Sequence, residues 1–172
     1  TQGNVTEEKT LADLDVISSL FNTLQVPKVF HTVGNHCLAA SRAVLASELF
    51  QHHPNNAAYY SVRLEGKGRG WRLIVLDTMD MSTNPTCPSP EEAQRFIAAH
   101  PADQHLQMGL GGGRANGGIA ANQICWLRAL LAECEREGEW ALVAMHHPAT
   151  TGVAPLSHLV WNYTDVFEIL TS

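Results

Sequence analysis

Two short apolar runs constrain the fold more than any other feature of this sequence. The first, WRLIVLD, spans Trp71–Asp77, and the second, WALVAM, spans Trp140–Met145. Each has the length of a strand, and neither shows the in-out alternation of a strand with one wet face. Continuous apolar strands are typical of sheets covered by helices on both faces. The runs therefore predict an α/β protein.

Helical spacing of apolar residues alternates with further strand patterns along the chain. Pro27 ends the first helical pattern, and Gly138 is placed to end the clearest one. A helix is also expected to start at Ser89, with Pro90 in its first turn and Glu92 completing a capping box. The remainder of Thr78–Gly118 reads as irregular. The other predicted helices are Leu11–Leu24, Ala39–Phe50, Ile119–Glu137 and one beginning near Asn162 or Thr164, and the other predicted strands are Val29–Val33 and Tyr59–Leu64.

Size and charge narrow the class of protein. The 172 residues suffice for one domain with a sizeable core and are too few for two ordinary domains. A formal net charge of −6 argues against nucleic-acid binding. No run approaches the roughly 18 apolar residues that span a bilayer, and no signal-peptide pattern opens the chain. Four cysteines without a C-x-x-C pair favour a reducing, cytoplasmic compartment.

Two polar signatures each follow a predicted strand. Gly34-Asn35-His36 comes directly after Val29–Val33, and His146-His147-Pro148 comes after Trp140–Met145. The carboxyl ends of strands are where α/β sheets place their ligand groups, so we expect one shared site. Imidazole and amide oxygen are ligands for divalent metals, and Gly34 is expected to let the backbone turn sharply. Taken singly, each signature is a weak signal of function, since Gly-Asn is an ordinary turn and His-His-Pro alone is equally weak.

The same residues resemble a known family. Gly34-Asn35-His36 and Met145-His146-His147-Pro148 are similar to two signature blocks of the calcineurin-like metallophosphoesterases. The segments YYSVRL, RLIVLDTMDMS, NGGIAANQICWLRALL and LVWNYTDVFEIL resemble the manganese-dependent ADP-ribose/CDP-alcohol diphosphatase branch, in order from about Leu11 to Leu170. The resemblance implies part of a metallophosphoesterase fold, a β-sandwich flanked by helices in α/β/β/α layers.

The resemblance also implies roles for individual residues. Asn35 and His146 match ligands of one metal ion, and His36 matches the histidine that contacts the phosphate and acts in catalysis. Two divalent ions are expected in the full-length enzyme, with Mn favoured and Mg, Fe or Zn possible. The other ligand blocks of the family are not in this sequence. We therefore expect residues 1–172 to be a single incomplete domain, an internal fragment that is inactive alone.

A second group of residues is expected to touch substrate or to support the ligands. The family usually has an acid where this chain has Cys37. This difference leaves open the hypothesis that the protein is a non-catalytic relative that serves as a scaffold. His52-His53 reads as a surface turn, and Trp161 reads as core. The supporting candidates are Gly34, Cys37, Asp77, Asn116 and His147, with Asp80 beside Asp77.

The expected function follows from the resemblance. The parent protein is expected to hydrolyse the pyrophosphate bond of ADP-ribose or CDP-alcohols, with a small nucleotide diphosphate as its partner and a monomeric state. Hydrolysis of a phosphomonoester or a cyclic nucleotide is the alternative within the same superfamily.

Overall fold

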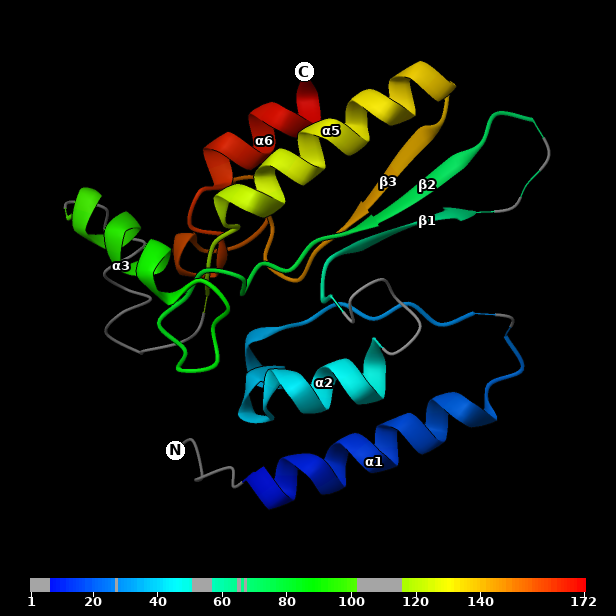
Figure 1. Cartoon of the computed structure of the whole chain (residues 1–172), viewed down its shortest axis with the longest axis vertical. Coiled ribbons are helices and arrows are strands. Elements are labelled where there is room, and N and C mark those ends of the chain that lie inside the picture. The colour runs from blue at the N-terminus through cyan, green and yellow to red at the C-terminus, as the bar shows by residue number, and fades with distance from the viewer. Residues whose placement is uncertain (1–6, 27, 51–56, 65, 67, 102–115) are drawn as a thin grey trace.

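The computed structural model describes residues 7–26, 28–50, 57–64, 66, 68–101 and 116–172, and Figure 1 shows their arrangement. Three strands form one mixed sheet in the order β1-β2-β3. The strands are β1 (Tyr60–Leu64), β2 (Trp71–Val75) and β3 (Trp140–Ala144). β1 runs antiparallel to β2, and β3 runs parallel to β2 with Val75 opposite Ala144. The carboxyl ends of β2 and β3 therefore meet at one end of the sheet.

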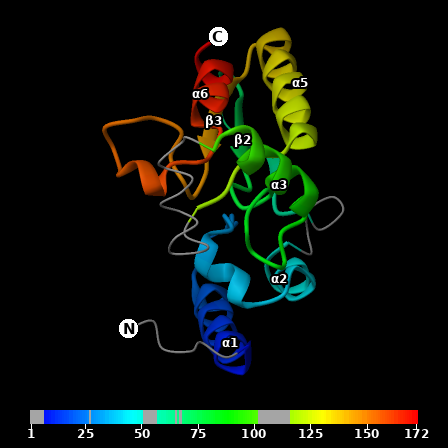
Figure 2. The same cartoon turned by 90° about the vertical axis from the view of Figure 1, so that its left-hand side faces the viewer.

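Helices lie on both sides of this sheet. In Figures 1 and 2, α5 and α6 cover one face, and α1 and α2 lie beyond the other. The helices are α1 (Glu7–Thr23), α2 (Arg42–Leu49), α3 (Pro90–Ala99), α5 (Ala121–Glu137) and α6 (Tyr163–Thr171), with short 3-10 helices η1 (Asn35–Ala39) and η3 (Leu156–His158). The α/β prediction is confirmed. The expected sandwich has two sheets, and the described residues form one sheet of three strands.

The central strand β2 is covered on both faces, which explains why its sequence is mostly apolar. Ile74 packs in the core beneath α5 and α6, whereas Leu73 and Val75 pack in a second core on the α2 side. Successive side chains of a strand point to opposite faces, so a strand covered on both faces needs apolar residues at every position. Arg72 is the exception, and its guanidinium pairs with Glu133 and Glu139.

Two predicted strands need correction. Val29–Val33 is not a strand, although Val33 is buried in the core. Its backbone is held by a side chain, because the Tyr60 hydroxyl donates to the carbonyl of His31 and accepts from its N–H, both at 2.9 Å. A short apolar run shows burial, and burial does not require a sheet partner.

The second correction concerns β3, which was expected to be buried. It forms an edge of the described sheet, where Trp140 is 50% exposed and Leu142 is 49% exposed. An apolar sequence therefore does not guarantee an internal strand. Arg69 stacks over the Trp140 ring, 4.0 Å from its centroid, and shields part of it.

The predicted capping box at α3 is also wrong. The Ser89 hydroxyl does not cap the helix; it donates to Asp80 at 3.4 Å. Glu92 instead accepts from the N–H of Ala121 at 2.8 Å. Both side chains thus tie α3 to neighbouring segments. At α5 the prediction is confirmed, because Gly138 ends that helix in the left-handed conformation with φ 67°.

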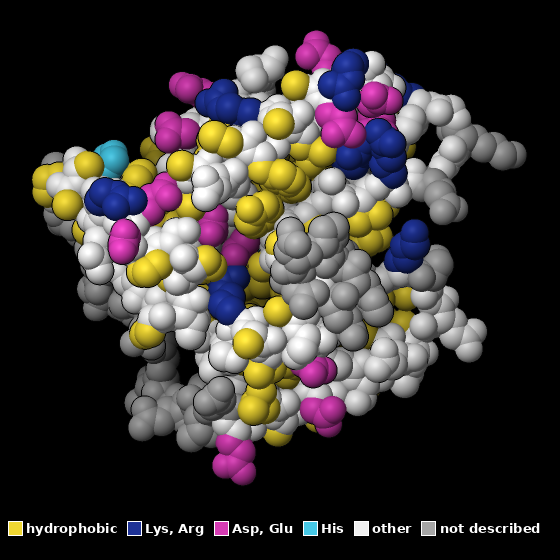
Figure 3. All heavy atoms as spheres, viewed as in Figure 1, with side chains coloured by type: hydrophobic (Ala, Val, Ile, Leu, Met, Phe, Trp, Pro, Cys, Tyr) yellow, Lys and Arg dark blue, Asp and Glu magenta, His cyan; other side chains and the backbone are white. Residues whose placement is uncertain are grey.

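Surface features are consistent with the acidic composition. On the face shown in Figure 3, basic side chains lie beside acidic ones and do not form a separate basic patch. Among the described residues, no helix combines the length and the apolar character needed to span a bilayer. All four cysteines are free thiols.

Candidate metal centre

The structure brings Asn35 and His146 into contact, although 111 residues separate them in the chain. Asn35 begins η1, and His146 lies just beyond β3. Nε2 of the His146 ring lies 3.0 Å from Oδ1 of Asn35, within hydrogen-bonding distance. The two residues that the resemblance assigns to one metal therefore face each other at the carboxyl end of the sheet.

The separation of these two atoms suits a shared cation. Two donor atoms at right angles around one ion, each about 2.1 Å from it, lie about 3.0 Å apart. The Oδ1–Nε2 distance has this value. Amide oxygen and imidazole nitrogen are also donor types that first-row divalent ions accept. The pair therefore fits two neighbouring positions of a metal coordination sphere.

Gly34 is required here by space. Its backbone, at φ −110° and ψ 170°, is in the extended region that any residue adopts. The expected sharp turn is therefore not the reason for glycine. A Cβ at this position would lie 2.8 Å from Cε1 and from Nδ1 of His146. A side chain on residue 34 would push the imidazole away from Asn35.

His36 is exposed and lies close enough to His146 to influence its titration. Partial burial lowers the pKa of His146, and the positive charge of His36 lowers that pKa further. The neutral imidazole is the form that binds metals. His36 is thus a solvent-exposed imidazole near His146.

Cys37 closes the loop that carries Asn35 and His36. Its Sγ accepts from the N–H of Gly34 at 3.4 Å, and the thiol is half-buried. A carboxylate could accept the same N–H more strongly, because charged acceptors form the stronger hydrogen bonds. The thiol therefore stabilises this turn through a weaker hydrogen bond than a carboxylate would form.

His147 is buried behind His146 and contacts Thr78. Its Nδ1 lies 2.8 Å from the Thr78 hydroxyl, and that oxygen accepts from the N–H of His147 at 3.4 Å. The rings of His146 and His147 meet edge to face with centroids 4.6 Å apart. His147 thus supports the neighbouring ring.

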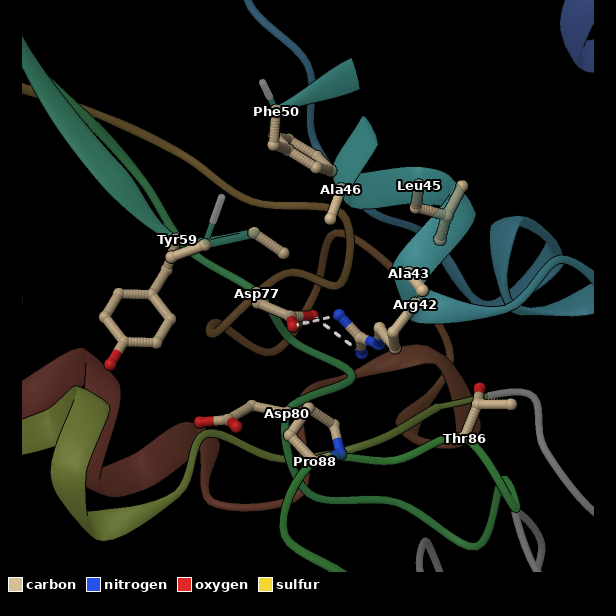
Figure 4. A pocket seen from close by; sticks show the side chains of 12 residues that line it. Arg42, Ala43, Leu45, Ala46, Phe50, Tyr59, Asp77, Asp80, Thr86 and Pro88 are labelled. Carbon is tan, nitrogen blue, oxygen red and sulfur yellow. Dashed lines mark hydrogen bonds and ion pairs between the residues drawn. The ribbon is translucent and has the colours of Figure 1, made fainter. Parts of the chain in front are cut away.

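Asp77 has its carboxylate engaged by an arginine. Arg42, at the start of α2, forms an ion pair with Asp77, and the N–H of Met79 donates to the same carboxylate at 2.9 Å. Figure 4 shows the Arg42 and Asp77 side chains pointing at each other. These contacts support a structural role for Asp77.

Asp80 is held by a buried amide. Gln123 donates to its Oδ2 at 2.9 Å, and the N–H of Ala120 donates to the same atom at 3.2 Å. Burial raises the pKa of the Asp80 carboxyl, and the charge of Asp77 adds to the rise. Its hydrogen bonds connect the segment after β2 to the start of α5.

A cavity of about 460 Å³ lies between α2 and this segment. Figure 4 shows Phe50, Tyr59 and the Arg42–Asp77 pair around it. Of the described residues that line it, none is Asn35, His36 or His146. This cavity and the candidate metal pair are thus formed by different residues.

The remaining candidates are placed away from the pair or are not described. Asn116 accepts from the indole N–H of Trp161 at 3.1 Å and donates to the carbonyl of Leu159 at 2.8 Å. Both Asn116 and Trp161 are buried, as expected for a core role of Trp161. His52-His53 and residues 102–115 of the glycine-rich segment lie outside the described residues.

Within the described part of the chain, no group of three or more His, Cys, Asp or Glu side chains could hold a metal ion. Asn35 and His146 together offer two donor atoms, fewer than the roughly six or more that a hard divalent ion takes.

Sequence reasoning missed three residues that hold this region together: Arg42, Thr78 and Gln123. Thr78 carried a usable signal, because it follows β2 at the same strand end that singled out Asp77. Arg42 and Gln123 lie within helices, where a buried polar side chain leaves no distinctive pattern.

This arrangement of helices and sheet is similar to that of a solved structure. A crystal structure of a dimetal phosphatase from Danio rerio matches the chain with a TM-score of 0.75 at 23% sequence identity, covering 95% of this chain and 56% of that one. The predicted partial metallophosphoesterase fold is confirmed.

The sequence is similar to named enzymes of one kind. Manganese-dependent ADP-ribose/CDP-alcohol diphosphatases match it from Arabidopsis thaliana, at 30% identity over 83% of this chain, from Oryza sativa subsp. japonica, at 28% over 98%, and from Mus musculus, at 27% over 92%. The chain spans about half the length of these relatives, 48%, 54% and 52% respectively. The resemblance seen in the sequence is confirmed. No protein-family model matches the chain.

Proposed function

We propose that this chain forms part of a metal-dependent hydrolase that cleaves the pyrophosphate bond of nucleotide-linked small molecules such as ADP-ribose and CDP-alcohols. The observation that carries the proposal is the Asn35–His146 pair, with donor atoms 3.0 Å apart. The named relatives support the choice of ion and of substrate class.

In this proposal Asn35 and His146 hold a divalent cation, with manganese favoured. Two such ions, when bound, neutralise the charge that develops on a reacting phosphate and on its leaving oxygen. The remaining ligands come from residues beyond this pair. The 172-residue chain alone, offering two donors of the about six that such an ion takes, is expected to bind Mn weakly and to lack turnover.

His36 is assigned the proton-transfer role. It is exposed near His146, and its side chain is not one of the partners in the Asn35–His146 contact. An imidazolium there donates to a phosphate oxygen or protonates the leaving group, the usual work of a general acid.

The test is a hydrolysis panel on the parent protein, purified metal-free and then supplied with Mn²⁺. ADP-ribose and CDP-choline represent the proposed substrates; p-nitrophenyl phosphate and a cyclic nucleotide represent the alternative. Release of AMP or CMP that requires Mn²⁺ and is lost in Asn35→Ala and His146→Ala supports the proposal. If only the monoester or the cyclic nucleotide is hydrolysed, the proposed substrate class is wrong and the alternative holds. If no compound is hydrolysed, the result favours the hypothesis of a non-catalytic scaffold protein, which Cys37 left open.

A further inference from the structure

The segment that leaves β2 contacts both loops that carry the candidate ligands. We propose that Asp77 and Thr78 are positioning residues that set the separation of Asn35 and His146 without touching the ion. Thr78 acts through His147, and Asp77 acts through Arg42. This inference rests on the proposed function, because it assigns the pair as metal ligands.

The Thr78 contact fixes the loop after β3. Thr78 is fully buried, and its hydroxyl reaches both the ring Nδ1 and the backbone N–H of His147, at 2.8 and 3.4 Å. One side chain thereby restrains the main chain and the side chain of the residue next to His146. The His147 ring in turn lies edge to face against that of His146.

The Asp77 contact fixes the other loop. Arg42 is the first residue of α2, and its guanidinium binds the Asp77 carboxylate and the carbonyl of Met79, the latter at 3.0 Å. Only Ala40 and Ser41 separate α2 from η1, and Ala40 is buried. Holding the first turn of α2 therefore also restrains η1, which begins with Asn35.

The segment itself is anchored to the core. Gln123 of α5 accepts from the N–H of Asp77 at 2.9 Å and donates to the carbonyl of Asp77 at 3.1 Å. The preceding residue, Leu76, donates its N–H to the carbonyl of Ala144 at 2.9 Å. Two adjacent residues on a fixed backbone thus hold two separate loops, which is the support that ligands need to keep their orientation.

The experiment compares Thr78→Val, which removes the hydroxyl at nearly constant volume, with Thr78→Ser, which keeps it. Thr86→Val is the matched control, because among the described residues the Thr86 hydroxyl bonds within its own turn, to Asn84 at 2.8 Å. Two readouts are taken by NMR on the parent protein. One is the nuclear Overhauser effect between the His146 ring and the Asn35 side-chain amide without metal. The other is the Mn²⁺ concentration that half-broadens the His146 ring signals.

Thr78→Val is expected to lose the Overhauser effect and to raise the half-broadening Mn²⁺ concentration about 10–100-fold, the usual effect of removing an outer-shell partner. Thr78→Ser and Thr86→Val are expected to retain both. Native values of both readouts in Thr78→Val overturn the role of Thr78. A loss of both in Thr78→Ser, which keeps the hydroxyl, also overturns it.

A second variant keeps the test decisive if Thr78→Val fails to fold. Arg42→Gln is expected to shift the Asn35 signals while leaving those of His147 in place, and unchanged Asn35 signals overturn the role of Asp77. If Mn²⁺ does not broaden Asn35 or His146 in the native parent protein, the proposed metal function fails. The metal-free comparison then still decides whether Asp77 and Thr78 position the pair.

Discussion

The backbone of Gly34 packs directly against the imidazole of His146. An added Cβ would lie 2.8 Å from two ring atoms and 2.9 Å from Nε2, the atom that faces Asn35. Real Cβ atoms do not approach a ring so closely, so the ring or the loop would have to move. Glycine at this position keeps the two donor atoms within 3.0 Å of each other.

Gly34→Ala is therefore expected to weaken Mn²⁺ binding about 10–100-fold, a loss similar to that of removing a ligand's support. The Mn²⁺ affinity of the parent protein is measured by electron paramagnetic resonance of the unbound Mn²⁺. Gly66→Ala is the control, because a Cβ at Gly66 meets nothing within 4 Å. Equal Mn²⁺ affinity in both variants would contradict the steric role of Gly34.

Substitutions of His36 and of His146 should have different effects on the Mn-loaded parent protein. His36→Ala is expected to lower kcat about 100–10,000-fold with metal content unchanged, as for loss of a general acid. His146→Ala is expected to lower metal content itself. Metal analysis beside a turnover assay makes the comparison, with His100→Ala as an exposed histidine control. A parallel loss of metal in His36→Ala would make His36 a ligand.

Gln123→Leu should destabilise the protein by about 2–4 kcal/mol, because buried polar groups lose their partners. Gln123 is fully buried and bonds Asp77 twice and Asp80 once. Chemical unfolding of Gln123→Leu and of the exposed control Gln94→Leu measures the difference. A change in the free energy of unfolding no larger than that of Gln94→Leu would show that this network contributes little.

Two adjacent glycines should differ in their tolerance of alanine. A Cβ at Gly117 would lie 2.7 Å from the backbone carbonyl oxygens of Met81 and Thr78, whereas a Cβ at Gly118 would first meet the Cε end of the Met81 side chain. A side-chain end can rotate away and a carbonyl of a packed segment cannot. Gly117→Ala is expected to lower the free energy of unfolding by about 1–3 kcal/mol, the typical cost of overpacking, and by more than Gly118→Ala does. Thermal unfolding of the two variants ranks them, and the reverse order would refute this explanation.

Stability should fall in mild acid partly because of His31. Burial lowers the pKa of His31 below its ordinary 6.5, and its ring lies edge-on to Phe21 with centroids 5.3 Å apart. Below pH 6.5 the unfolded chain binds the proton more readily than the folded one, so the folded state loses stability until the pH passes the lowered pKa.

Urea unfolding of the native chain and of His31→Phe, from about pH 5 to about pH 8 where histidines titrate, tests this prediction. The variant should show a shallower fall in its free energy of unfolding. Some fall remains, because the pKa of His146 is lowered as well. Identical pH profiles would exclude His31 as a contributor.

The sequence predicted those parts of the fold that depend on local pattern. β2 was found because its short run is almost continuously apolar, and α5 was found because its apolar spacing is long and regular. The Asn35–His146 contact was expected from two strand ends, but only His146 follows a strand in the structure, and Asn35 begins η1. Val29–Val33 was misassigned because a backbone can be buried and satisfied by one tyrosine hydroxyl in place of a strand. Such a long-range contact leaves no periodicity in the sequence.

The contacts of the residues that support the site could not be predicted from the sequence, for a related reason. The Thr78–His147 and Arg42–Asp77 contacts join residues 69 and 35 positions apart. A pattern read along the chain cannot show which distant polar side chains meet. The need for glycine at position 34 likewise depends on a ring 112 residues away, as the positions of Gly34 and His146 show.

The open edge of β3 places completion of the sheet and completion of the site in the same location. In the described sheet β3 has β2 on one side only, and His146 lies just past its carboxyl end. A strand that hydrogen-bonds along this edge would pair with the backbone of β3, and one of its ends would lie beside His146. Adding a strand there would extend the sheet and, in the same event, deliver neighbours to an ion held by Asn35 and His146.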